Sequence, residues 1–114
     1  MADTLEQLRA QKCTPLKGAE HGLSVTEVQD SLAALPGWAL SDDGKTISKD
    51  FAFKNFYRTM AFVNAIAWIA NREDHHPDLG VHYDRCVVRF STHDVGGLSE
   101  NDFILAAKTE TLAD

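Results

Sequence analysis

The chain has 114 residues, the length of a single domain, and 44% of them are hydrophobic, enough for a core without disulfide or metal staples. Its formal net charge is -6 at pH 7. This acidic balance argues against direct binding to nucleic-acid phosphates and against docking on an anionic membrane surface.

Residues 1–22 are polar and weakly periodic. Thr14-Pro15 and Lys17-Gly18 interrupt any helix there, which predicts an arm that lies over the domain surface or is partly disordered. Residues 23–114 are then expected to form one domain.

The first helix is predicted to begin at Ser24, which forms a capping-box pattern with Glu27, and to end at Pro36-Gly37. The apolar residues at helical spacing are Val25, Val28, Leu32 and Leu35. Residues 38–40 and 46–53 are predicted to form a hairpin around the turn Asp42-Asp43-Gly44. The residues of its second strand that share one face are Ile47, Lys49, Phe51 and Phe53.

A long helix is predicted from the cap Asn55 to about Arg72. Its apolar stripe contains Phe56, Met60, Val63, Ala67 and Ala70, and is widened by Phe62, Ile66 and Ile69. A separate apolar flank carries Tyr57, Ala61 and Trp68. Because a helix that is apolar on two flanks usually touches more than its own core, this second flank is either a subunit interface or covered by a long loop.

Residues 79–83 and 86–92 are predicted to form a second hairpin joined by Asp84-Arg85. Such a turn puts six apolar residues on one face, in the pairs Tyr83 with Cys86, Val81 with Val88 and Leu79 with Phe90. Asp-Arg is not a favoured turn dipeptide, although the register agrees with the apolar pattern. Extended outward, this register sets His76 opposite His93.

Gly96-Gly97 is a predicted corner, and Ser99 starts the last helix. The order helix, two strands, helix, two strands, helix predicts an α+β fold, with helices packed on one face of a four-stranded antiparallel sheet. Asp102 follows Ser99 by three residues and completes a capping-box pattern, with Asp in place of Glu or Gln. Capping alone explains Asp102, but a capping carboxylate can also orient a histidine.

Three histidines are the candidate chemical groups: His75, His76 and His93. Pro77 disfavours helical geometry at His76, so the adjacent pair is expected where the long helix meets the next strand. Imidazole titrates near neutral pH, and such a set can donate and accept protons. A merely exposed or structural pair is one alternative. A zinc or iron site is another, but adjacent histidines are an awkward ligand frame.

These residues resemble the signature of the pterin-4a-carbinolamine dehydratases, which covers residues 23–110 here. The matching residues are His75-His76-Pro77, Tyr83, Thr92-His93, Gly97-Leu98-Ser99 and Asp102, with support from Gly37-Trp38, Phe51 and Phe53, and residues 101–108. Five residues separate Pro77 from Tyr83, nine separate Tyr83 from His93, and eight separate His93 from Asp102. One position departs: the family commonly has an ionisable residue four positions before the first histidine, where this chain has Asn71. If the ionisable residue at that position adjusts the first histidine in the family, the adjustment of His75 is weaker in this chain or comes from another residue. We therefore expect a reduced or altered rate of reaction.

The resemblance implies dehydration of 4a-hydroxytetrahydropterin to quinonoid dihydropterin and water, which recycles the pterin cofactor of aromatic amino acid hydroxylases. It implies no metal and no bound cofactor, and a homodimer or homotetramer. His75 and His93 would be the acid and the base, in an order left open, and His76 would orient the pterin. Asp102, Trp38 and Thr92 would contribute to the substrate site, although Trp38 after a Pro-Gly turn fits the core better than a ligand contact.

Two further expectations concern partners and compartment. A dimeric protein-binding or co-regulatory module with weak or vestigial activity is the rival reading, because family members elsewhere serve as dimerisation cofactors of a homeodomain transcription factor. Cys13 and Cys86 form no CxxC pair, which fits a reducing cytoplasm. We expect no signal peptide, since the N-terminus lacks a basic start before an apolar run, and no membrane span, since the longest apolar stretch is residues 65–70.

Overall fold

The computed structural model describes residues 3–16 and 18–113. Its helices are α1 (Leu5–Ala10), α2 (Val25–Leu32), α3 (Phe56–Glu73) and α4 (Glu100–Glu110). Its strands are β1 (Ala39–Leu40), β2 (Ile47–Ala52), β3 (Asp78–Val81) and β4 (Arg85–Phe90). Two short 3-10 turns are η1 (Ala19–His21) and η2 (His93–Val95). No helix in the described part of the chain is long and apolar enough to cross a membrane.

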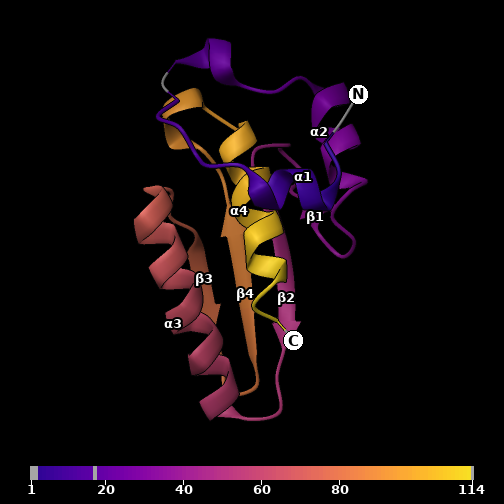
Figure 1. Ribbon diagram of the computed structural model, residues 1–114. Coiled ribbons are helices and arrows are strands. Elements are labelled where there is room, and N and C mark those ends of the chain that lie inside the picture. Colours follow the sequence, from indigo (N-terminus) through magenta and orange to yellow (C-terminus); the bar gives the residue numbers. More distant parts are fainter. Residues whose placement is uncertain (1–2, 17, 114) are drawn as a thin grey trace.

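The four strands pair antiparallel in one sheet, in the order β1-β2-β4-β3. α3 and α4 cover the same face of this sheet (Figure 1). Ile47 and Phe51 of β2 point into the core, whereas Asp50 and Ala52 on the other face are exposed. The predicted α+β fold, with helices on one face of a four-stranded antiparallel sheet, is therefore confirmed.

α2 begins with the predicted capping box. The Ser24 hydroxyl accepts from the Glu27 N–H at 3.2 Å, and the Glu27 carboxylate accepts from the Ser24 N–H at 2.9 Å. Val28 and Leu35 are buried as expected, but Val25 is 72% exposed. The buried stripe is thus narrower than predicted, because the first residue of the helix faces solvent.

The β3–β4 hairpin differs from the predicted register by two residues. Val81 pairs with Cys86, where the sequence predicted Tyr83 as the partner. Tyr83-Asp84 form the turn, and Tyr83 is 66% exposed instead of lying on the apolar face. A shift of two leaves the remaining strand residues on their predicted faces, since side chains alternate along a strand with period two.

α3 is capped as predicted, with the Asn55 side chain accepting from the Arg58 N–H at 2.9 Å. Its buried face is centred on the residues expected only to widen the stripe: Phe62, Ile66 and Ile69. Two residues predicted on the stripe are exposed, namely Phe56 and Ala67. Phe56 lies at the start of the helix and stacks on Tyr83 of the hairpin turn, with ring centroids 6.4 Å apart.

The second apolar flank of α3 is open. Tyr57 is 82% exposed and Trp68 is 62% exposed, and Ala61 between them is exposed as well. The Arg72 guanidinium lies 4.6 Å from the centre of the Trp68 ring. Within residues 3–16 and 18–113 nothing covers this flank, so the alternative of a covering loop is wrong for the described chain.

The N-terminal segment contains a helix that the sequence did not lead us to expect. Thr4 and Gln7 form a capping box that opens α1, with bonds of 3.2 and 2.8 Å between side chains and N–H groups. Leu8 is buried in the core, and α1 lies against α4 (Figure 1). The available signal was the pattern Thr4-x-x-Gln7, with leucines at positions 5 and 8.

α4 is buried along nearly its whole length, since residues 101–109 are all buried. The sheet lies on one side of this helix and α1 on another (Figure 1). Even Lys108 is only 9% exposed, and its ammonium donates to the Arg9 carbonyl at 2.8 Å. At the far end, the Glu110 carboxylate accepts from Trp38 Nε1 at 2.8 Å and from Lys49 Nζ at 2.6 Å. These contacts fix the helix that carries Asp102.

Candidate active site

The end of α3 sets the direction of the histidine pair. Asp74 adopts left-handed backbone geometry (φ 53, ψ 42), and the His75 N–H donates back to the Ala70 carbonyl at 3.1 Å. This is the wider hydrogen bond of a Schellman motif, and Asp tolerates the left-handed conformation better than most residues. Pro77 then favours extended backbone at His76. The pair therefore lies at the predicted junction between α3 and β3.

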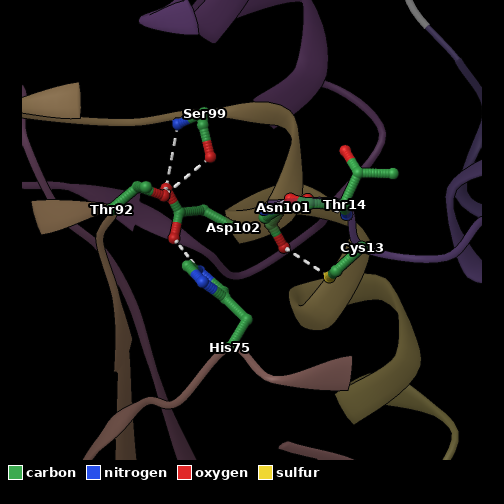
Figure 2. A network of polar contacts seen from close by, with 7 residues as sticks. All are labelled: Cys13, Thr14, His75, Thr92, Ser99, Asn101 and Asp102. Atoms are coloured by element: carbon green, nitrogen blue, oxygen red, sulfur yellow. Dashed lines mark hydrogen bonds and ion pairs between the residues drawn. The ribbon is translucent and has the colours of Figure 1, made fainter. Parts of the chain in front are cut away.

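His75 points toward the N-terminal end of α4, where it meets Asp102 (Figure 2). His75 Nε2 lies 2.6 Å from Oδ1 of the fully buried Asp102. The other carboxylate oxygen, Oδ2, accepts from the Thr92 hydroxyl at 2.7 Å and from the Ser99 N–H at 2.9 Å. Hydrogen bonds to both oxygens offset the cost of burying the carboxylate. Asp102 thus contacts the helix start and His75 at once, the two roles that the sequence left open.

These contacts fix the direction in which protons are donated. An ionised Asp102 only accepts, so Thr92 Oγ1 donates to it, and the Ser99 hydroxyl, 2.6 Å away, donates to Thr92. His75 likewise donates its Nε2 proton. Nδ1 of His75 is then the nitrogen left to accept a proton.

Two aromatic rings support His75 from the core. The Phe90 ring stacks on the imidazole at an angle of 12°, with centroids 6.2 Å apart. Trp38 packs on Phe90 at 6.0 Å and is 7% exposed, so its expected place in the core is confirmed. Trp38 therefore supports His75 through Phe90.

A hollow of about 360 Å³ lies beside His75. Its lining includes Thr92, Asp94 and the N-terminal residues 13–16, a segment called the strap below. Burial, with the Glu73 carboxylate acting in the same direction, raises the pKa of the Cys13 thiol to about 12. Cys13 is therefore a protonated thiol at neutral pH and not a thiolate nucleophile.

His76 is exposed, and its Nε2 lies 3.0 Å from the Asn71 side-chain oxygen. Because an amide oxygen only accepts, His76 carries its proton on Nε2. The sequence led us to connect position 71 with His75, whereas in the structure it contacts His76. An amide there orients the second histidine without adding charge.

His93 is exposed in the turn η2, directly after Thr92. It lines a second hollow, of about 430 Å³, which also includes Thr92. The predicted pairing of His76 with His93 across the hairpin is wrong, because β3 begins only at Asp78 and the observed register is shifted by two.

The structure thus brings part of the predicted set together. Hydrogen bonds join His75, Asp102 and Thr92. Trp38 does not contact this network directly but packs on Phe90, which stacks on His75. No hydrogen bond within residues 3–16 and 18–113 links His76 or His93 to that network. In the same part of the chain, no group of three or more His, Cys, Asp or Glu side chains is placed to hold a metal ion.

Two residues beside the hollow were missed by sequence reasoning. Glu73 has a side chain only 6% exposed, and it accepts the Cys13 N–H at 2.8 Å. Asn101 exchanges two hydrogen bonds with the Thr14 backbone, at 3.2 and 2.7 Å. These contacts join residues 60 and 87 positions apart, so no local pattern signals them.

The family model described as Pterin 4 alpha carbinolamine dehydratase matches residues 21–112. The chain belongs to this family. The match contains all four residues of the hydrogen-bonded network around His75, and it begins after the strap. The family expected from the histidine signature of the pterin carbinolamine dehydratases is therefore confirmed.

Relatives among the pterin-4-alpha-carbinolamine dehydratases, which are hydro-lyases by name, are similar over most of their length. One from Stenotrophomonas maltophilia (strain K279a) is 61% identical over 114 residues, which cover 100% of this chain and 97% of the relative. One from Xanthomonas euvesicatoria pv. vesicatoria (strain 85-10) is 62% identical over 102 residues, or 90% of this chain and 86% of the relative.

Two solved structures share the fold of this chain. A transcriptional coactivator/pterin dehydratase from Brucella melitensis aligns with a TM-score of 0.78 and 34% identity, over 81% of this chain and 98% of that chain. A pterin dehydratase-like protein identified as a RuBisCO assembly factor in the alpha-carboxysome aligns with a TM-score of 0.59 and 23% identity, over 68% and 89% of the two chains. The second likeness concerns the fold alone.

Proposed function

We propose that this chain dehydrates a 4a-hydroxytetrahydropterin to quinonoid dihydropterin and water, by general acid–base catalysis through histidines. The observation that carries the proposal is the buried Asp102 carboxylate held 2.6 Å from His75 Nε2. The family of the chain supports the substrate class and the reaction.

We assign His75 the role of the base, and its hydrogen bond to Asp102 supports this choice. The reaction removes a proton from N5, forms the C4a–N5 double bond and breaks the bond from C4a to the hydroxyl oxygen. Nδ1 of His75 takes the N5 proton, while Asp102 stabilises the resulting imidazolium. A positioned base of this kind contributes roughly 10²- to 10⁴-fold in rate.

His93 is the proposed acid. Thr92 lines both the hollow at His75 and the hollow at His93, so a substrate lying over Thr92 would reach one histidine on each side. From there His93 would protonate the departing hydroxyl, which leaves as water. His76, oriented by Asn71, would hold the pterin ring.

The remaining proposed substrate-site residues act close to His75. Asp102 holds His75 in place and is itself held by the Thr92 hydroxyl. Thr92 also lines both hollows. Trp38 would contribute through Phe90, which it holds against the imidazole. In this scheme Trp38 is a positioning residue.

The test is the decay of freshly generated 4a-hydroxytetrahydropterin, followed by stopped-flow ultraviolet absorbance. Wild type should accelerate the decay, and His75→Ala and His93→Ala should each abolish most of that acceleration. The matched control is His82→Ala, since His82 is an exposed histidine beside the hairpin turn. No acceleration by the wild-type protein would refute the proposal.

The partners follow from the same proposal. The reaction would recycle the pterin cofactor of an aromatic amino acid hydroxylase, in the cytoplasm, where the free thiols Cys13 and Cys86 would stay reduced. The acidic chain would bind neither nucleic acid nor membrane. The open flank of α3, with Tyr57 and Trp68, would be the interface of a homodimer or homotetramer.

A second candidate function is a dimeric protein-binding or co-regulatory module with weak activity. The exposed Tyr57–Trp68 flank and the likeness to a transcriptional coactivator/pterin dehydratase favour it. A partner protein that copurifies equally well with wild type and with His75→Ala would support this function. Loss of the partner in Trp68→Glu would place the contact on α3.

A further inference from the structure

The strap is anchored on two sides of the hollow at His75. The Cys13 N–H donates to the buried Glu73 carboxylate at the end of α3, at 2.8 Å. The Thr14 backbone exchanges two hydrogen bonds with Asn101 in the first turn of α4. Figure 2 shows Cys13 and Thr14 against Asn101, near the end of α4 that His75 also approaches. The strap is therefore a wall of this hollow that is tied to both α3 and α4.

The lining of the same hollow carries the proposed chemistry. It includes His75 and Thr92, together with Asp94. The chain after the strap is tied down as well, because the Gly18 N–H donates to the Asp94 carbonyl at 3.0 Å. A molecule that fills this hollow and touches His75 therefore also touches the strap.

The structure of a tetrahydropterin indicates which of its groups lies there. N5, the atom that loses the proton, is bonded to C4a and to C6. The substituent on C6 is thus the variable group closest to the reacting nitrogen. With N5 at His75, that substituent is the part of the substrate placed to enter the space beside the strap.

We propose that the strap binds the C6 substituent and sets the preference of the enzyme for a hydroxylated side chain over a methyl group. This inference rests on the proposed dehydratase function. The lining favours a polar substituent, because Thr14, Asp94 and Asn101 all offer hydrogen-bonding groups. Asn101 acts here as a positioning residue that holds the strap in place.

The experiment compares two substrates, the 4a-hydroxy forms of tetrahydrobiopterin, with a dihydroxypropyl group on C6, and of 6-methyltetrahydropterin. The ratio of their kcat/KM values is measured for wild type, Asn101→Ala and Pro15→Gly. Asn101→Ala removes both anchors of Thr14. Pro15→Gly loosens the strap at an exposed position and leaves its anchors and the core untouched. The control is Glu100→Ala, an exposed neighbour of Asn101 that does not line this hollow.

We expect the ratio to fall roughly 5- to 10-fold in both strap variants, the effect of one lost hydrogen bond to the side chain, and to stay unchanged in the control. Calorimetric binding of the stable analogues 7,8-dihydrobiopterin and 6-methyl-7,8-dihydropterin should show the same change in ratio. An unchanged ratio, or an equal loss for both substrates, would overturn the role of the strap. Acceleration of neither substrate by wild type would instead overturn the proposed function, and the strap inference with it.

Discussion

Replacing Asp102 with asparagine keeps the shape of a buried group and changes its hydrogen bonding. Oδ2 accepts from Thr92 and Ser99, and Oδ1 faces His75. The asparagine oxygen must take the Oδ2 position, because an NH₂ group there would face the Ser99 N–H, donor against donor. The NH₂ group then donates to His75 Nε2, and the ring proton moves to Nδ1. The nitrogen proposed to accept the substrate proton is thereby blocked.

The magnitudes follow from the three hydrogen bonds to Asp102. Each changes from charge-assisted to neutral, at about 1 kcal/mol, and relief of the desolvation of a buried charge offsets part of that loss. The free energy of unfolding should fall by about 2 kcal/mol, which corresponds to a melting temperature lower by roughly 8 °C. Turnover should fall by about 10²- to 10⁴-fold, the contribution of a lost general base.

The assay pairs thermal unfolding by circular dichroism at neutral pH with stopped-flow turnover. Asp102→Ala is the comparison, because it leaves the donors of Ser99 and His75 without partners and should destabilise more than asparagine does. Wild-type turnover in a folded Asp102→Asn protein would refute the tautomer reasoning. An asparagine variant less stable than the alanine variant would refute the proposed placement of its amide.

Four further outcomes are expected. His75→Ala and His93→Ala should lower turnover strongly while the far-ultraviolet circular dichroism stays that of wild type; wild-type turnover in both would remove the acid–base assignment. His76→Ala should mainly raise KM in the same assay, and an unchanged KM with a large loss of kcat would give His76 a proton-transfer role. Because burial raises the pKa of the Cys13 thiol to about 12, its alkylation by iodoacetamide, followed by peptide mass mapping, should still accelerate at about pH 10; a plateau near pH 9 would contradict this. Trp68→Glu should lower the mass measured by analytical ultracentrifugation relative to Ala67→Glu, an exposed position turned roughly 100° away on the same helix, and equal masses would remove the Tyr57–Trp68 flank from the interface.

Local sequence patterns were sufficient to predict those features of the structure that depend on residues close together in the chain. The Ser24–Glu27 capping box forms as expected, and hydrogen bonds from the Ser24 N–H and hydroxyl hold the pKa of Glu27 below its usual range. Asn55 caps α3 in the same way. The dual use of Asp102 was also foreseeable, because its capping position and the histidine pair are each visible in the sequence.

The hairpin register shows what a pattern leaves undetermined. Alternation of apolar and polar residues fixes only which face a side chain takes, so registers that differ by two residues are equivalent by this criterion. Only the residues of the turn could distinguish the two registers. Neither Asp84-Arg85 nor the observed Tyr83-Asp84 is a dipeptide favoured in two-residue hairpin turns, so the sequence did not indicate which register forms. The expected contact of His76 with His93 depended entirely on that choice.

The strap could not be predicted, for a different reason. Glu73 and Asn101 have ordinary sequence neighbours, and their hydrogen bonds to the strap form only because residues 13–14 return to the ends of α3 and α4. Position 71 illustrates the same limit. Its side chain meets His76 because of the left-handed turn at Asp74, a detail of the helix end that spacing alone does not give.

The burial of α4 has a consequence for motion at the site. A helix enclosed along residues 101–109 cannot unwind without disrupting the core, so its amide hydrogens should exchange with solvent only through global unfolding. Asp102 sits in the first turn of that helix, whereas the strap lies outside the helices and is held to them by three hydrogen bonds of its backbone. Hydrogen exchange should therefore separate two timescales within one site: a slow one for the frame that positions the proposed proton-transfer groups, and a fast one for the wall proposed to meet the variable part of the ligand.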